Sequence, residues 1–149
     1  MKVSKFIAIA AALAASGAVD AVEIFKDYAP SKRVVNMTMV KVNPNRIDDY
    51  LGGLRQTWQT GCDVQKKMGH VTDCWIMVNE ANAAGPFNVV LAMVFKDSAS
   101  MEPNEERYKA FQAEWRKALA EDKRKNLVEG YEEIRTQWGE GNYRIVEWK

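Results

Sequence analysis

The sequence predicts an α+β protein in which a four-stranded antiparallel sheet carries its helices on one face. The first observation is the order of the expected elements, which is strand, helix, strand, strand, helix, strand. The second is the stretch 87–95, which is apolar on both alternating faces and therefore suits the middle of a sheet. The third is a long amphipathic helix directly after the first strand.

The first strand is expected at residues 34–42, where β-branched and methionine residues are interspersed with Asn36 and Thr38. A helix is expected to follow from Pro44, because proline is tolerated at a first helical position and acidic residues come next. Gly69 is expected to end this helix. Its apolar residues recur at spacings of three and four and predict one buried stripe: Ile47, Tyr50, Leu51, Leu54, Trp58, Cys62 and Met68.

The second and third strands are expected at residues 75–81 and 87–95, joined as a hairpin by 82–86. A second helix is expected from Pro103, with a break near Gly130. The buried stripe of this second helix is expected to be Tyr108, Phe111, Trp115 and Leu119. The cluster Gly139, Glu140, Gly141 and Asn142 predicts a turn, and residues 143–148 alternate enough to predict the last strand.

This element order is the split βαβ, or ferredoxin-like, arrangement, with the first and third strands in the centre. Together with the stretch VNMTMVKVNPNRIDDYLGGLRQTW, it resembles the dimeric α/β-barrel superfamily, which includes antibiotic-biosynthesis monooxygenases, EthD-like proteins, NIPSNAP proteins and muconolactone isomerases. The resemblance covers about residues 34–149. It implies a ligand cleft between each sheet and its two helices.

Haem-degrading members of that superfamily use an Asn on strand one, a Trp on strand three and a His on helix two. Asn36 matches the first of these residues, but strand three holds no Trp and helix two holds no His. The resemblance therefore does not extend to haem, and we expect no cofactor.

The N-terminus has the three-part pattern of a signal peptide: Lys2 and Lys5, an apolar run over 6–15, and small residues up to Ala21. Cleavage after Ala18 or Ala21 satisfies the small-residue rule, and an uncleaved anchor is the alternative. We expect a signal peptide at 1–21, an arm or linker at 22–33, one domain at 34–149, and a periplasmic or secreted protein.

Cleavage would leave a neutral chain, because the formal net charge of the full sequence is +1 and the leader carries Lys2, Lys5 and Asp20. A neutral domain without a basic stripe predicts neither a nucleic-acid partner nor a membrane-surface partner.

An oxidising compartment permits disulfides, and the sequence contains two cysteines, Cys62 and Cys74. We expect them to be bonded to each other, with two buried thiols as the alternative. One histidine, His70, with these cysteines is too few ligands for a structural zinc site, so no metal is expected.

The sequence contains no evident catalytic set. His70 titrates near neutrality, but it follows a capping glycine and is expected in a solvated loop. Two glycines inside a helix break the local pattern, so Gly52 and Gly53 indicate either room for a ligand or tight packing. The ligand hypothesis places a small apolar or aromatic molecule near these glycines, with the contacts Tyr50, Gly52, Gly53, Arg55, Trp58, Tyr108 and Trp115.

Two functions follow from these patterns. The first is a non-catalytic, exported module that binds a small apolar molecule or serves in assembly. The second is a cofactor-independent monooxygenase or isomerase of the barrel type. In both cases we expect a homodimer, because helices on one side leave the other sheet face bare, with Val90, Ala92 and Val94 or the opposite set in the interface.

Overall fold

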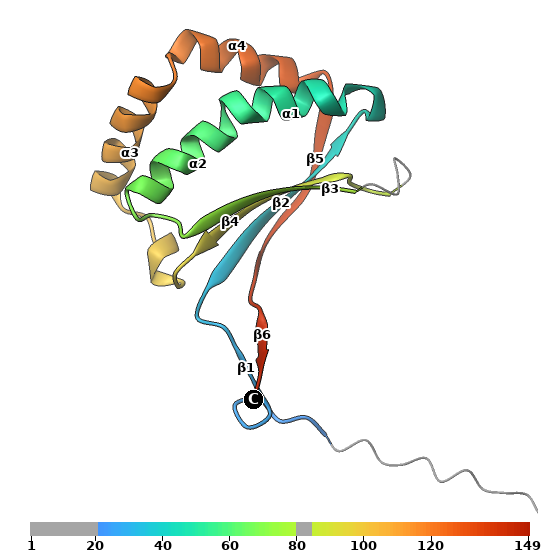
Figure 1. Cartoon of the computed structure of the whole chain (residues 1–149), viewed down its shortest axis with the longest axis vertical. Helices are drawn as coiled ribbons and strands as arrows, with labels where there is room; N and C mark the ends of the chain where they lie inside the picture. Colours follow the sequence, from blue (N-terminus) through green and yellow to red (C-terminus); the bar gives the residue numbers. More distant parts are fainter. Residues whose placement is uncertain (1–20, 80–84) are drawn as a thin grey trace, which may run out of the picture.

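A computed structural model describes residues 21–79 and 85–149. Its body has two layers, a four-stranded antiparallel sheet and helices that cover one face of it (Figure 1). The strand order is β3-β4-β2-β5, so the predicted ferredoxin-like fold is confirmed. The strands of this sheet are β2 (Val34–Val42), β3 (Asp73–Val78), β4 (Val89–Phe95) and β5 (Arg135–Tyr143). The helices are α1 (Ile47–Gln56), α2 (Trp58–Lys67), α3 (Glu105–Ala118) and α4 (Glu121–Glu132).

The two central strands, β2 and β4, divide the apolar residues between two cores. Val40 pairs with Val89, and both face the helices, where they join the main core. The other members of this core are Val42, Tyr50, Leu54, Leu91, Tyr131 and Ile134. Val35, Ala92 and Val94 form a separate cluster on the opposite face. Of the two alternative sets expected on the bare face, the structure thus places Ala92 and Val94 there, while their role in an interface stays a prediction.

The third strand begins at Val89, two residues later than predicted. Just before this strand, Asn88 is buried and its side chain bonds β2: its Oδ1 accepts from Val42 N and its Nδ2 donates to Val42 O, each at 2.8 Å. The backbone of Asn88 still donates to Val40 O and accepts from Asn79 N. The predicted end of the second strand, at residues 80 and 81, and most of the predicted hairpin lie outside the described residues.

The long first helix is bent at Thr57, which separates α1 from α2. The Thr57 hydroxyl donates to the carbonyl oxygen of Gly53 at 3.0 Å, while the backbone N–H of Thr57 bonds the same oxygen. A hydroxyl that competes for the carbonyl four residues back is a known cause of helix bending. The predicted single helix is thus two consecutive helices joined by a kink (Figure 1).

The break in the second helical region lies at Leu119, so the prediction of a break near Gly130 is wrong. Asn104 caps α3 by accepting from the N–H of Arg107 at 2.7 Å. Leu119 has an extended backbone and is buried, and α4 begins two residues later. Burial of the Leu119 side chain sets the corner, whereas Gly130 lies inside α4, where its cost in helix propensity is only about 1 kcal/mol.

The prediction that residues 143–148 form the last strand of the main sheet is wrong. That strand is β5 (Arg135–Tyr143), which contains the predicted turn cluster. Glycines and Asn142 favour a turn in an isolated peptide, yet here they pair with β2. The Tyr143 ring covers Gly141, where an added Cβ would lie 3.0 Å from the ring. Pairing with a central strand has overridden the local preference for a turn.

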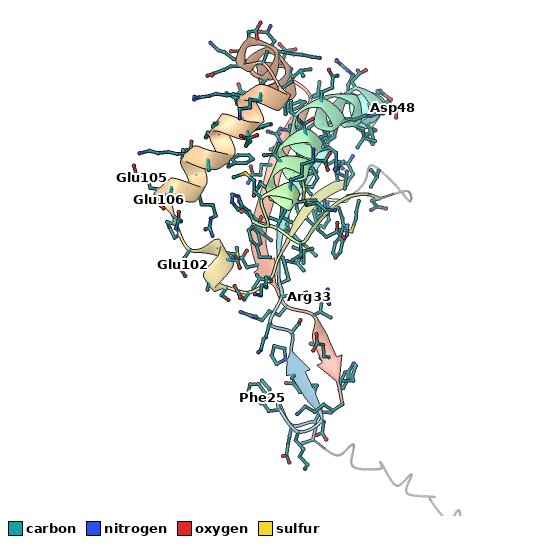
Figure 2. The ribbon with its side chains drawn as sticks, turned by 60° about the vertical axis from the view of Figure 1, so that its left-hand side comes forward. Phe25, Arg33, Asp48, Glu102, Glu105 and Glu106 are labelled. Carbon is teal, nitrogen blue, oxygen red and sulfur yellow. A yellow bond between two sulfur atoms is a disulfide. The ribbon has the colours of Figure 1, made fainter. Side chains whose placement is uncertain are left out.

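The two ends of the described chain form a separate two-stranded arm. Strands β1 (Tyr28–Pro30) and β6 (Val146–Trp148) pair antiparallel and project from the body (Figure 1). Figure 2 shows Phe25 near the far end of this arm and Arg33 at its base. Residues 22–33, expected as an arm or linker, therefore contribute a strand. The expected signal peptide, apart from Ala21, lies outside the described residues.

Candidate functional site

The space predicted beside Gly53 is filled. A Cβ placed on Gly53 would lie 2.6 Å from the ring of Tyr131, which comes from α4. The Tyr131 hydroxyl lies 2.8 Å from Thr57 Oγ1, and its ring meets that of Tyr50 edge to face at 5.1 Å. Gly53 is therefore a site of close packing, which is the alternative that the sequence left open. Gly52 has no atom near its missing Cβ because it is on the exposed side of α1.

Arg135 completes this packed group. Its guanidinium donates to the Tyr50 hydroxyl at 3.0 Å and lies over the rings of Tyr50 and Tyr131. Burial raises the pKa of both tyrosines above the ordinary value, although Arg135 acts against the increase at Tyr50. The hydroxyl groups of both tyrosines thus have hydrogen-bond partners within this group.

The other residues predicted to contact a ligand are spread over the helices. Trp58 packs against the main core, and Arg55 is exposed on α1. Trp115 of α3 packs against α2 at Gly61, where an added Cβ would be 3.2 Å from its ring, and it stacks on Phe111. Among the described residues its Nε1 is buried without a hydrogen-bond partner. The structure thus does not bring the seven predicted residues together, and their ligand role stays a prediction.

A cavity of about 710 Å³ lies at the other end of the helical layer, between α3 and the sheet. Its sheet side is formed by Asn36 of β2, Phe95 of β4 and Glu140 of β5. Tyr108 and Phe111 line it from α3, and the segment 100–104 closes its end. Tyr108 is thus the member of the predicted ligand set that lines the cavity, and its side chain is 63% exposed.

The sheet side of this cavity is polar. Asn36 Nδ2 donates to Glu140 Oε1 at 2.9 Å and to Asn142 Oδ1 at 3.0 Å. His70 and Gln65 line the cavity from the α2 side, and Gln65 Nε2 lies 3.9 Å from Met93 Sδ. Burial, assisted by the nearby Arg107, lowers the pKa of His70, which favours the neutral imidazole. Apolar walls with a few convergent polar groups are typical of small-molecule sites.

Sequence reasoning missed Glu140 because it assigned that segment to a turn. A pattern in strand one could have indicated such a site. Its helix-facing positions are polar in the first half (Asn36 and Thr38) and valine in the second half (residues 40 and 42). A polar residue in a strand that is otherwise buried on both faces needs a partner, and this one is 104 residues away.

Cys62 and Cys74 form a disulfide, with Cα atoms 6.5 Å apart, so the predicted pairing is confirmed. It joins α2 to the helix-facing side of β3. Residues 21–79 and 85–149 include no group of three or more His, Cys, Asp or Glu side chains placed to hold a metal ion. Within the same ranges, no helix is both long and apolar enough to span a bilayer.

Comparisons with known proteins add little to this geometry. No protein-family model and no curated protein matches the chain. A solved structure similar to it is described as a dimeric protein of unknown function with a ferredoxin-like fold, from Bacteroides fragilis. The two chains are 10% identical, the match covers 78% of this chain and 99% of that one, and the TM-score is 0.45. Similarity at this level carries no argument about activity or assembly.

Proposed function

We propose that this protein is an exported homodimer that binds a small molecule with an apolar or aromatic body in the cavity between α3 and the sheet. The observation that carries the proposal is the cavity of about 710 Å³, which falls within the usual range for ligand pockets. The rings of Phe95, Tyr108 and Phe111 line it, and aromatic walls suit a flat or aliphatic guest.

The contacts of α3 explain why the cavity lies between this helix and the sheet. Trp115 fixes α3 against α2, and Leu119 turns the chain away into α4. No residue of α3 is buried, although Phe111 and Trp115 are half-buried. A helix with an apolar stripe over a space that it does not fill is a reasonable wall for a guest.

Two observations support export. The residues before Val22 have the pattern of a cleaved leader, and a disulfide is compatible with an oxidising compartment. The expected mature N-terminus is Val19 or Val22, and N-terminal sequencing of protein recovered from the periplasm or medium checks it. Recovery of an intact leader in the cytoplasm would contradict export.

The open sheet face supports the homodimer. Besides its buried cluster, this face carries Trp75 and Met77, each 40% exposed, and Met37, which covers part of that cluster. Apolar surface on the uncovered side of a two-layer protein is typical of an interface. A two-fold contact would bury the same residues on both copies.

A catalytic role, as a cofactor-independent monooxygenase or isomerase, is the alternative, and no observation favours it. Among the described residues, the hydrogen bonds join no hydroxyl or thiol to His70. We therefore propose binding and not turnover.

The ligand site is tested with 2-(2-naphthyl)ethanol, a neutral aromatic probe, by titration calorimetry. Tyr108→Ala removes an exposed wall of the cavity and should weaken binding about five- to tenfold through lost ring contact. The matched control is Tyr143→Ala, which removes an exposed tyrosine from the opposite sheet face and should leave binding unchanged. The reverse pattern would place the probe on the open face and contradict the cavity.

The dimer is tested by light scattering over a range of concentrations. Met77→Lys puts a charge on the open face and should weaken the dimer at least about tenfold, because a buried unpaired charge is costly. Val78→Lys is the matched control, since Val78 is 38% exposed on the same strand but points to the helix side. A wild-type protein that is monomeric at micromolar concentration would refute the dimer.

A further inference from the structure

Glu140 brings a carboxylate to the sheet side of the cavity without a cation beside it. It lies on β5 opposite Thr38, on the side of the sheet that faces the helices. Its Oε1 accepts the amide hydrogen bond from Asn36 at 2.9 Å. In the part of the chain that the structure describes, no ion pair involves Glu140. A neutral donor therefore orients the carboxylate, and its negative charge is not paired with a cation among the described residues.

The amide of Asn36 is saturated as a donor beside Glu140. Asn36 Nδ2 uses its two hydrogens on Glu140 Oε1 and Asn142 Oδ1, so its amide has no donor left for a guest. A carboxylate or phosphate placed here would meet oxygen atoms and a like charge. An ammonium group, which has three donors and no acceptor, fits the same atoms.

The other charged residues around the cavity do not reverse the preference for a positively charged guest. Glu102 and Glu105 also line it, and Figure 2 shows both near the N-terminal end of α3. Lys109 pairs with Glu105, and Arg107 donates to the carbonyl oxygen of Glu102. Even with both of these cations counted, negative charge is in excess. Burial and the nearby Arg107 lower the pKa of His70, which disfavours a positive charge there.

The walls suit the remainder of such a guest. Phe95 approaches from the sheet, and Tyr108 and Phe111 approach from α3. Aromatic rings bind apolar bodies by area and stabilise a neighbouring ammonium through their electron-rich faces. A cation near Glu140 with an apolar body between these rings would use both parts of the cavity.

We infer that the ligand is an amphiphilic amine, with its ammonium group at Glu140 and its apolar body between Phe95 and Phe111. This inference rests on the proposed ligand cavity and adds the chemical class of the ligand. Arg55, one of the predicted ligand contacts, does not line this cavity.

The test uses three probes of one shape on the purified full-length protein: 2-(2-naphthyl)ethylamine, 2-(2-naphthyl)ethanol and 2-naphthylacetic acid. The amine should bind about two- to fivefold more tightly than the alcohol, since Glu140 is solvent-exposed and an exposed ion pair is weak. The acid should bind more weakly than the alcohol. Titration calorimetry at low ionic strength measures all three.

Glu140→Gln keeps the size of the side chain and an acceptor for Asn36. It should remove the advantage of the amine and leave the alcohol unchanged, and unchanged alcohol binding also reports that the variant is folded. Glu106→Gln is the control for the general field, because Glu106 is a neighbouring carboxylate on α3 that does not line the cavity (Figure 2). It should retain the advantage of the amine.

The outcomes separate the two proposals. Equal binding of amine and alcohol, tighter binding of the acid, or an amine advantage that survives Glu140→Gln would overturn the amine inference while the cavity proposal stands. Failure of all three probes to bind would overturn the cavity proposal together with the inference built on it.

Discussion

The two ends of the helical layer cover the same sheet, yet one end is closed and the other is open. At the closed end, Tyr131 of α4 fits against Gly53, and Thr57, Tyr50 and Arg135 hold it by hydrogen bonds and ring contacts. At the open end, α3 contacts α2 through Trp115 and leaves about 710 Å³ between itself and the sheet. One layer thus provides a packed core and a cavity.

The residues of the sheet explain this difference. Below the closed end, β2 presents Val40 and Val42, and both are fully buried. Below the open end, it presents Asn36, which is bonded to Glu140 and half-buried. Apolar residues stabilise by burial under a helix, whereas burying an amide and a carboxylate under one would cost free energy. The comparison teaches that the cavity is kept open by the polar side of the sheet as well as by the position of α3.

The largest effect is expected from the disulfide, which fastens α2 near the open end. Replacing Cys62 and Cys74 by alanine should lower the free energy of unfolding by about 3 kcal/mol, because the bond closes a loop of 12 residues in the unfolded chain. Urea unfolding measures this loss, and reduced wild-type protein should unfold at nearly the same urea concentration as the variant. A variant as stable as the oxidised wild type would show that the bond contributes nothing.

A smaller effect is expected at the closed end from Gly53→Ala. The new methyl group would lie 2.6 Å from the Tyr131 ring, and overpacking of a core costs about 1–3 kcal/mol. Gly52→Ala is the matched control, since no atom lies within 4 Å of its Cβ position, and it should be neutral or stabilising by up to about 1 kcal/mol. Equal stability of the two variants in urea would mean that Tyr131 does not fill the space beside Gly53.

The smallest effect is expected from Tyr131→Phe, which removes one hydroxyl. The loss should be about 1 kcal/mol, because Thr57 Oγ1 keeps its bond to the Gly53 carbonyl oxygen. Tyr108→Phe at the open end should not change stability, since that side chain is exposed. Calorimetric binding of 2-(2-naphthyl)ethanol should be the same in Tyr131→Phe and wild type. A changed affinity would show that the closed end controls the cavity, and the contrast between the ends would fail.

Local patterns predicted the central part of this fold well. The alternation in 87–95 placed β4 in the middle of the sheet and put Ala92 and Val94 on one face, which the structure shows to be the face away from the helices. The spacing of apolar residues also oriented Cys62 toward the sheet, where Cys74 meets it. The prediction of the last strand failed at Gly139, because its pairing with Met39 depends on a strand 100 residues earlier, which a turn pattern does not contain.

By itself, the sequence determined the element order, the faces of the central strands and the partners of the disulfide, because periods of 2 and 3.6 residues are properties of a local stretch. The tertiary structure decided which space is filled and which is open. Whether Gly53 makes room for a ligand depends on Tyr131, and whether Asn36 lines a cavity depends on Glu140. Each of these contacts joins residues far apart in the chain, so its outcome depends on how α3, α4 and β5 pack and not on any periodicity within them.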